Sequence, residues 1–585
     1  MKKYLIINSL LLLVLATVTS CDSYLEEQNP NEISSDIYWS TLEESESNLT
    51  SVYGAMLDER IYTVDTEAWR SDEAHAGGRF NNNAAVKEQD VTENARNWYE
   101  QQFDENMIQL QDRWNAIYQV IFRANQVIEG LDSMTEDLKS NPRWTEQMGQ
   151  ARFFRGLGHF YLHSVYNHGK IVVRDKNPLN IADFHKPVSE SSEVIEFFRE
   201  DLKYAYENLP GQMEPRTRVD AGAAGTILGM SYLYEKEFAE AEAVFDDIIN
   251  NKNKDYGYSL VQDWTLMFTK AGDFNSESIF EINYSDHIPV VGTTGTQEDF
   301  SQVKSRTAAP RDAGGRNPNR KFTAAAWLIE AYASDELDVS DPRNTVIDRA
   351  GVTRLRKVSL RNSAMLAVVN DEDAEYYLAP SAPVRHNFAF AGLYGFFKKY
   401  TNHDFVADER DIGENSFQSF KNVVVNRLSG VYLMMAECKL ELGKLDEGLF
   451  YINEIRKRWG LLALEGEDYD TVEEVTDRLR FYEYPMELCV EGFSTRNIDL
   501  RRWGVGKQRF EELSQLDFYA TDYTYLNEDA DGTGTRQQCL VVKGVTTDED
   551  DLQLNREYVQ AAQFYSDGYL PLPASETINN PNVSN

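Results

Sequence analysis

Cysteine is scarce in this chain, and its scarcity excludes a fold stabilised by a framework of disulfide bonds. The 585 residues contain only Cys21, Cys438, Cys489 and Cys539. If Cys21 is set aside for the reason given below, three cysteines remain, and an odd number cannot all pair within one chain. Cys438 lies in the apolar helical stretch 433–438, so we expect a buried thiol rather than a nucleophile. The core itself must therefore hold the fold together.

Basic residues are also in short supply. The chain has 58 lysines and arginines against 96 aspartates and glutamates, which gives a formal net charge of −38. Such an excess of negative charge disfavours nucleic acid and anionic lipid as partners, and it favours solubility and neutral or cationic ligands. Hydrophobic residues still make up 42% of the chain, so a large core is available.

Long hydrophobic runs are missing after the first segment of the chain. Met1-Lys2-Lys3 is positive, residues 4–16 are mostly apolar, and small residues then lead into Cys21. This pattern predicts a signal peptide over residues 1–20, with Cys21 lipidated as the first residue of a mature envelope lipoprotein. The alternatives are an ordinary secretory signal that happens to contain a cysteine, or a short membrane anchor. The run is shorter than the about 20 apolar residues that span a bilayer.

Motifs for catalysis are absent. Neither a G-x-S-x-G motif nor a G-x-x-x-x-G-K-[ST] loop occurs, and no carboxylate pair stands out among so many. His159 and His163 are four residues apart, with His168 nearby, which is a possible metal-binding spacing. No glutamate separates the first two histidines, so we expect packing or hydrogen-bonding roles instead. No catalytic site stands out here and no cofactor is expected; that the protein is not an enzyme is implied by the family resemblance described below.

One acidic segment resembles the start of a calcium-binding loop. Asn527-x-Asp529-x-Asp531-Gly532 has the right opening, but position twelve is Gln538, where a bidentate glutamate is needed. An Asp-Gly turn in a surface loop is the simpler interpretation. We therefore predict no bound metal here.

Apolar residues spaced three and four apart predict that helices dominate the chain. Single helices are expected over 112–131, 146–166 and 194–209, and two helices with a short turn are expected within 221–249 and within 426–459. The segments between them are richer in polar, glycine and aromatic residues and are expected to be irregular. These segments are 59–105, 283–320, 370–420 and 516–560.

Two of the expected helices share the pattern L-G-x-x-Y. The copies Leu157–Tyr161 and Leu228–Tyr232 lie about two tetratricopeptide periods of 34 residues apart. Ala241 and Phe245 follow the second copy where that repeat has a small and an aromatic residue, and Ala436, Gly443, Gly448 and Ile452 form a weaker copy. The expected fold is mostly α, a tetratricopeptide-like helical-repeat scaffold with long irregular loop insertions that carry the ligand site.

Several motifs, taken together, resemble the SusD/RagB family of outer-membrane nutrient-binding lipoproteins of Bacteroidetes. They occur in family order along nearly the whole chain, with a departure at Ser494-Thr495, where the family usually has a basic and an aromatic residue. The motifs are Cys21-Asp22-Ser23-Tyr24-Leu25-Glu26, Trp114-x-x-x-Tyr118-x-x-Ile121-x-x-Ala124-Asn125, Glu487-Leu488-Cys489-Val490-Glu491-Gly492-Phe493, Asp499-Leu500-Arg501-Arg502-Trp503-Gly504, Tyr569-Leu570-Pro571-Leu572-Pro573-Ala574-Ser575-Glu576 and Asn580-Pro581-Asn582.

The resemblance implies both an organisation and a function. It implies a SusD-like region over 21–250 and a SusD/RagB-like region over 251–585. It also implies a lipid-anchored protein of the outer membrane, exposed at the cell surface, that captures oligosaccharides and delivers them to a TonB-dependent SusC-like transporter. A RagB-like peptide-binding lipoprotein and an envelope interaction scaffold without a ligand remain alternatives. Glu487 and Arg501 are expected to hold the C-terminal part together by ion pairs or backbone caps.

The ligand site is predicted from residue chemistry in the irregular segments, because no family motif fixes it. Carbohydrate recognition needs aromatic faces for the apolar side of a pyranose and planar polar groups for its hydroxyls. Trp69 and either Trp98 or Tyr99 are the predicted stacking platforms, and the alternative for each is a loop anchor packed into the scaffold. The full set of predicted ligand-binding residues is Asp65, Trp69, Arg70, Asp72, Arg79, Asn81, Trp98, Tyr99, Tyr284 and Tyr394.

Overall fold

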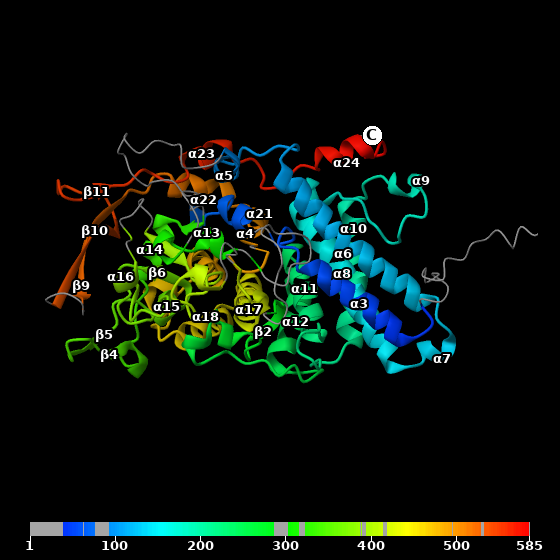
Figure 1. Cartoon of the computed structure of the whole chain (residues 1–585), viewed down its shortest axis with the longest axis horizontal. Helices are drawn as coiled ribbons and strands as arrows, with labels where there is room; N and C mark the ends of the chain where they lie inside the picture. Colours follow the sequence, from blue (N-terminus) through cyan, green and yellow to red (C-terminus); the bar gives the residue numbers. More distant parts are fainter. Residues whose placement is uncertain are drawn as a thin grey trace, which may run out of the picture.

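The computed structural model describes most of the chain, and its first long helices form one side of the molecule. The helices drawn from blue to cyan stand side by side at the right of Figure 1. Most of the C-terminal half fills the centre and left, and the C-terminus lies above the right-hand helices. No helix in the described ranges is both long and apolar enough to cross a membrane. The described residues are 39–62, 64–75, 93–285, 302, 304–314, 322–386, 388, 394–412, 418–493, 495–527 and 532–583.

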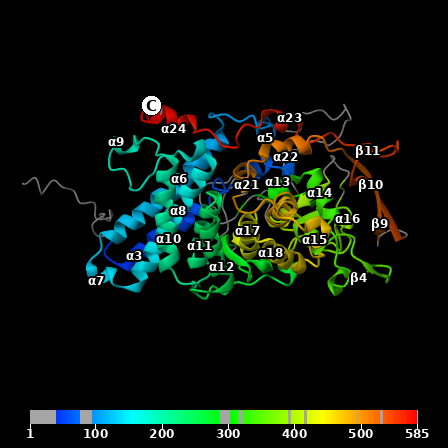
Figure 2. The same ribbon diagram turned by 180° about the vertical axis from the view of Figure 1, so that it is seen from behind.

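The long helices pack in chain order, each against the next, and Figure 2 shows the same layer from behind. The helices expected over 112–131, 146–166 and 194–209 are confirmed as α6, α8 and α10. Both two-helix predictions are confirmed by the hairpins α11–α12 and α17–α18. The long helices are α3 (Leu42–Met56), α6 (Ile108–Asp132), α8 (Pro142–Val165), α10 (Ser191–Asn208), α11 (Ala221–Tyr234), α12 (Phe238–Asn250), α17 (Leu428–Glu441) and α18 (Leu445–Arg458).

The glycines of the L-G-x-x-Y pattern lie where neighbouring helices meet most closely. A Cβ atom added to Gly158 would lie 2.7 Å from Cγ1 of Ile121 on α6. One added to Gly229 would meet the ring of Phe245 on α12, the aromatic residue at the repeat position after the second copy. Gly443 has a different role, because no atom lies within 4 Å of a Cβ added to it. Its φ of +74° is a backbone conformation that favours glycine, and it forms the turn between α17 and α18.

Short helices and small antiparallel sheets build the rest. The strand pairs are β1 (Ala74–His75) with β3 (Thr323–Ala324), β2 (Ser278–Ile282) with β8 (Val423–Arg427), β4 (Thr345–Ile347) with β5 (Thr353–Leu355), β6 (Leu366–Val368) with β7 (Gly395–Phe397), and β9 (Phe518–Asn527) with both β10 (Gly532–Lys543) and β11 (Leu552–Gln553). The short helices are α4 (Val64–Trp69), α5 (Glu93–Tyr99), α7 (Glu136–Lys139), α9 (Ile181–Phe184), α13 (Ser305–Ala308), α14 (Ala326–Ala333), α15 (Leu360–Met365), α16 (Ala382–Arg385), α19 (Val472–Arg478), α20 (Tyr484–Leu488), α21 (Arg496–Arg502), α22 (Gly506–Leu513), α23 (Val559–Phe564) and α24 (Ala574–Asn579).

All four segments expected to be irregular contain regular structure: α13 lies within 283–320, and α16 and β7 lie within 370–420. The segment 516–560 forms the β9–β10 ribbon at the left of Figure 1. Its acidic composition hides an alternation of buried residues, Phe518 and Ala520 and then Tyr523 and Tyr525, which shifts by one residue where the register of the ribbon changes. The segment 59–105 likewise contains α4, β1 and α5.

One hydrophobic core runs from the helical layer into the C-terminal part. At their junction the ring of Tyr161 on α8 stacks on that of Phe493, with 3.7 Å between centroids. The predicted division of the chain at residue 250 stays a prediction. Cys438 and Cys489 are buried free thiols, as expected for Cys438, and Cys539 is buried as well.

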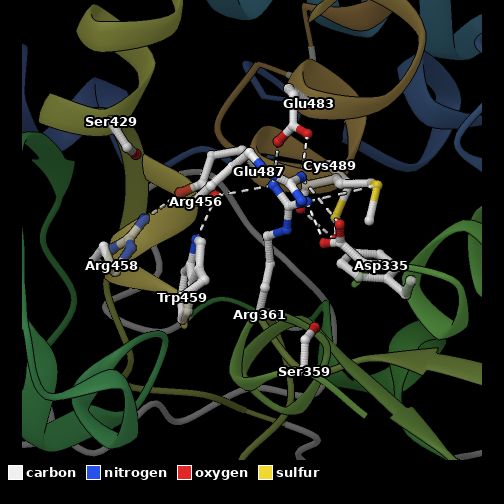
Figure 3. A network of polar contacts seen from close by, with 12 residues as sticks. Asp335, Ser359, Arg361, Ser429, Arg456, Arg458, Trp459, Glu483, Glu487 and Cys489 are labelled. Carbon is white, nitrogen blue, oxygen red and sulfur yellow. Dashed lines mark hydrogen bonds and ion pairs between the residues drawn. The ribbon is translucent and has the colours of Figure 1, made fainter. Parts of the chain in front are cut away.

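A buried network of arginines and carboxylates ties the C-terminal helices together (Figure 3). Arg361 on α15 is 0% exposed and binds Asp335 at 2.5 Å and Glu483 at 2.7 Å. Arg456 on α18 binds the same two carboxylates. Each charge therefore has a partner of opposite sign, which is what makes burial of so many charges tolerable.

The family-like motifs near the C-terminus have structural roles. Glu487 accepts hydrogen bonds from the Arg427 guanidinium at 2.8 Å and from the Trp459 indole at 2.6 Å. Arg501 donates to the Ser164 carbonyl in the last turn of α8 at 2.6 Å, and its guanidinium lies 3.7 Å from the ring centre of Tyr569. Glu487 makes the expected ion pairs inside the C-terminal part, whereas Arg501 caps a backbone carbonyl of α8, which lies outside that part.

Candidate ligand-binding region

Contacts between distant parts of the chain bring several segments of the irregular regions together. Tyr284 donates its backbone N–H to the Asn422 side chain at 3.0 Å, and Gln302 pairs with Ser419 in an antiparallel bridge. The Gln302 side chain accepts the backbone N–H of Lys304 at 2.8 Å. We call Asp65, Tyr284, Gln302, Lys304, Ser419 and Asn422 the loop frame.

Asp65 and Lys304 form the most accessible polar pair of this frame. Asp65 is placed by the first turn of α4 and Lys304 directly precedes α13. Their side chains are 3.4 Å apart and 21% and 10% exposed. Burial alone would lower the pKa of Lys304, but Asp65, Glu59 and Asp58 outweigh it and raise the pKa above its usual value. A charged donor and a carboxylate acceptor thus stand together, a combination that suits sugar hydroxyls.

Tyr284 is buried within the loop frame. The residue is 2% exposed, and its hydroxyl donates to the Leu57 carbonyl at 3.1 Å and hydrogen-bonds to the hydroxyl of Tyr62. Tyr284 therefore supports the frame from inside the protein and does not present a stacking face.

Trp69, Arg70 and Asp72 point into the protein. The Trp69 side chain is 6% exposed, and Arg70 binds Glu67 at 2.9 Å. Asp72 binds Arg496 at 2.7 Å. Burial alone would raise the pKa of Asp72, but Arg496 and Arg509 lower it to about 2. Asp72, which follows α4, ties this helix to α21 and α22 through Arg496 and Arg509. All three residues are buried, so their predicted contact with a ligand stays a prediction that their exposure does not support.

The other aromatic candidates, Trp98 and Tyr99 as platforms and Tyr394 as a further ligand contact, are buried or half-buried. Trp98 is 2% exposed and stacks on Phe103 at 5.4 Å, and Tyr394 is 2% exposed within the core. Tyr99 is half-buried, and its hydroxyl accepts the backbone N–H of Tyr558 at 3.0 Å. The structure gives Trp98 and Tyr99 the role of loop anchor that was the alternative to stacking. Arg79 and Asn81 lie outside the described residues.

Sequence reasoning missed Gln302 and Lys304. Neither stands in a motif, and nothing local links Lys304 to Asp65, which lies 239 positions earlier in the chain. Lys304 and Asp65 meet only in the folded protein, where the bridge between Gln302 and Ser419 fixes the segment that carries Lys304.

The histidines have structural partners. His159 is fully buried, and its ring bonds to the Arg155 carbonyl at 2.8 Å and accepts the backbone N–H of Arg174 at 3.1 Å. His163 bonds to the Ser191 hydroxyl at 2.8 Å. Across the part of the chain that the structure describes, no group of three candidate ligands could hold a metal ion. Asp529 and Asp531 lie outside that part.

Known proteins resemble this chain over nearly its full length. The family model described as "SusD family" matches residues 276–585, and that described as "Starch-binding associating with outer membrane" matches residues 23–233. A SusD-like protein of Bacteroides ovatus is 22% identical, over 82% of this chain and 80% of that protein. A SusD superfamily protein from Bacteroides vulgatus shares the fold with a TM-score of 0.66 and 22% identity, over 93% of this chain and 98% of its own. A laminarin binding SusD-like protein has a TM-score of 0.61 and 18% identity, over 92% and 97%.

Proposed function

Because the chain belongs to the SusD family, we propose that it binds an oligosaccharide and delivers it to a TonB-dependent SusC-like transporter of the outer membrane. The observation that carries glycan binding is the fold shared, over 92% of the chain, with a protein described as laminarin binding. The role is one of binding, not of catalysis, and it needs no cofactor.

The loop frame is the part of the described surface that supports this proposal best. Asp65 and Lys304 offer an acceptor and a charged donor at its edge. Asp58 and Glu59 add further negative charge around Lys304. A polyanionic glycan would meet like charge here, so a neutral oligosaccharide is the proposed ligand. Without a deep aromatic slot, the dissociation constant should be micromolar or weaker, a binding free energy of about −8 kcal/mol or less in magnitude.

The proposed position of the protein is the outer face of the outer membrane, held by acyl chains on Cys21. The signal-like segment 1–20 and the match of residues 23–233 to a family described as associating with the outer membrane both support this. The transporter partnership rests on the family alone.

A titration with matched variants tests the binding site. Lys304→Ala should weaken oligosaccharide binding about tenfold, because a charged hydrogen bond is lost. Lys439→Ala is the control, since Lys439 and Glu242 on the helical layer form an ion pair with exposed fractions of 10% and 19%, against 10% and 21% for Lys304 and Asp65. Calorimetric titration against neutral oligosaccharides, polyanionic glycans and peptides measures both variants.

Three outcomes would change the proposal. Equal affinity of both variants and the wild type for a neutral oligosaccharide would move the site away from the loop frame. Binding of peptides alone would favour the RagB-like alternative. Binding of nothing in the panel would favour the interaction scaffold.

A further inference from the structure

A short segment around α9 carries large apolar side chains into solvent. Leu179 is 92% exposed, Ile181 78% and Phe184 47%. Ile578 on α24 is 78% exposed. Single exposed apolar residues are ordinary on a protein surface, but a group of large ones on adjacent elements indicates a contact surface. We call these four residues the apolar tip.

The polar groups of the segment are used internally, so the apolar side chains are held outward. The Asp183 carboxylate accepts the backbone N–H groups of Leu179 at 2.9 Å and Asn180 at 3.1 Å. Arg174, itself 6% exposed, donates to the carbonyls of Asp183 at 2.9 Å and Phe184 at 2.7 Å. These hydrogen bonds hold the turn in one conformation.

The C-terminal helix fastens to the same segment. The Asn580 side chain donates to the Lys186 carbonyl at 2.7 Å, and Asn582 donates to the His185 carbonyl. Figures 1 and 2 both place α24 beside α9 at one end of the molecule. Ile578 thus lies on the element that adjoins Leu179, Ile181 and Phe184.

The chain enters the fold next to this tip. Asn177 donates its backbone N–H to the Glu129 carboxylate at 2.8 Å, and the neighbouring Gly130 packs directly against the ring of Trp39. Residues 22–38 separate Trp39 from Cys21 and can reach at most about 60 Å. An acyl chain on Cys21 would therefore tether the molecule to a membrane at this end, at a distance of at most about 60 Å.

Charge at the tip also differs from that of the whole chain, which carries −38. Lys186 pairs with Asp175, and Arg174 lies 3.9 Å from Glu576. Residues 174–186 carry Arg174, Lys176 and Lys186 against Asp175 and Asp183, with Glu129 and Glu576 beside them. A lipid surface would therefore repel this patch less strongly than the rest of the protein.

We infer that the apolar tip rests on the lipid surface and, together with the anchor, fixes the orientation of the protein on the membrane. Exposed aliphatic and aromatic side chains beside a polar support are the groups that enter the headgroup region of a bilayer. The inference rests on the lipid anchor at Cys21 that forms part of the proposed function.

Fluorescence quenching by lipid tests the inference in the full-length acylated protein. A polarity-sensitive dye is attached to Ile181→Cys, and the buried thiols of Cys438, Cys489 and Cys539 leave this site selective. The control is Ile347→Cys on β4, which is 73% exposed in the native protein and lies at the opposite end of the molecule in Figure 1. Vesicles of phosphatidylethanolamine with a brominated lipid serve as quencher, and flotation reports whether the protein is anchored.

The tip dye should lose about half of its emission in anchored protein, and the control dye should lose none. Anchored protein in which neither dye is quenched, or both are quenched equally, would overturn the inference and leave the anchor intact. Protein that does not float with vesicles would refute the anchor and the inference together. A tip dye shielded in intact cells but not in vesicles would assign the patch to a protein partner.

Discussion

Replacing Glu557 with glutamine should stabilise the protein at about pH 8 and have much less effect at about pH 5.5. One oxygen of this buried carboxyl group accepts the Ala326 N–H, at the start of α14, at 3.0 Å. The other finds no hydrogen-bond partner among the described residues. Burial raises the pKa of Glu557 from 4.5 to about 8. The folded protein therefore favours the protonated form, whereas the unfolded chain releases the proton.

The sign and the size follow from these two pKa values. Because the folded pKa is the higher one, the stability contributed by the protonated group is complete below about pH 4.5 and is lost as the pH rises towards about 8. Between about pH 5.5 and pH 8 the free energy of unfolding of the wild type should fall by about 3 kcal/mol more than that of Glu557→Gln.

Glu277 provides a control of opposite sign. It is equally buried, but Arg458 and Arg427 outweigh the effect of burial and lower its pKa to about 2. The stability that ionised Glu277 contributes is present above about pH 4.5 and is lost as the pH falls towards about 2. Glu277→Gln should therefore lower the free energy of unfolding at neutral pH by about 3–5 kcal/mol. Urea unfolding of both variants and the wild type at the two pH values gives the comparison. Parallel pH dependence of Glu557→Gln and the wild type would refute the reasoning.

Further variants probe packing, the ion network and the anchor. Gly229→Ala should lower the free energy of unfolding by about 1–3 kcal/mol, because its Cβ meets Phe245, whereas Gly430→Ala, whose nearest contact is an ordinary 3.6 Å, should not; equal melting temperatures would contradict this. Arg361→Met should lower the free energy of unfolding by about 3–5 kcal/mol, because buried carboxylates lose their charged partner. A urea unfolding curve equal to that of the wild type would contradict this. Cys21→Ala should abolish acylation and release the protein from membranes, as measured by intact mass and fractionation; wild-type protein without lipid would defeat it.

The scaffold could be predicted because its signals are local. Apolar residues at helical spacing lie within each helix, so each helix can be predicted from its own sequence. The contact between Gly229 and Phe245 also lies within one hairpin, so the residues that make it are close together in the sequence. The β9–β10 ribbon was missed because polar and acidic residues dominate its exposed positions and obscure the alternation of buried ones.

The site could be predicted only in part, because residue type does not determine exposure. Trp69 and Trp98 have the chemistry of a sugar platform, but the same rings also fill cores, and here they do. Asp72 is bound by Arg496, which lies 424 positions away in the chain, so no local sequence pattern could predict that ion pair. Asp65 stays partly exposed only because α4 begins beside Lys304.

Hydrogen exchange with and without a bound oligosaccharide is the most direct test of the central claim, which is that this protein binds a glycan at the loop frame. The ligand is the neutral oligosaccharide that the calorimetric panel finds to bind most tightly. Backbone amides of α4, Lys304 and Asn422 should exchange more slowly in its presence, and those of α10 and α12 on the helical layer should not change. Protection of the helical layer, with the loop frame unchanged, would contradict the account.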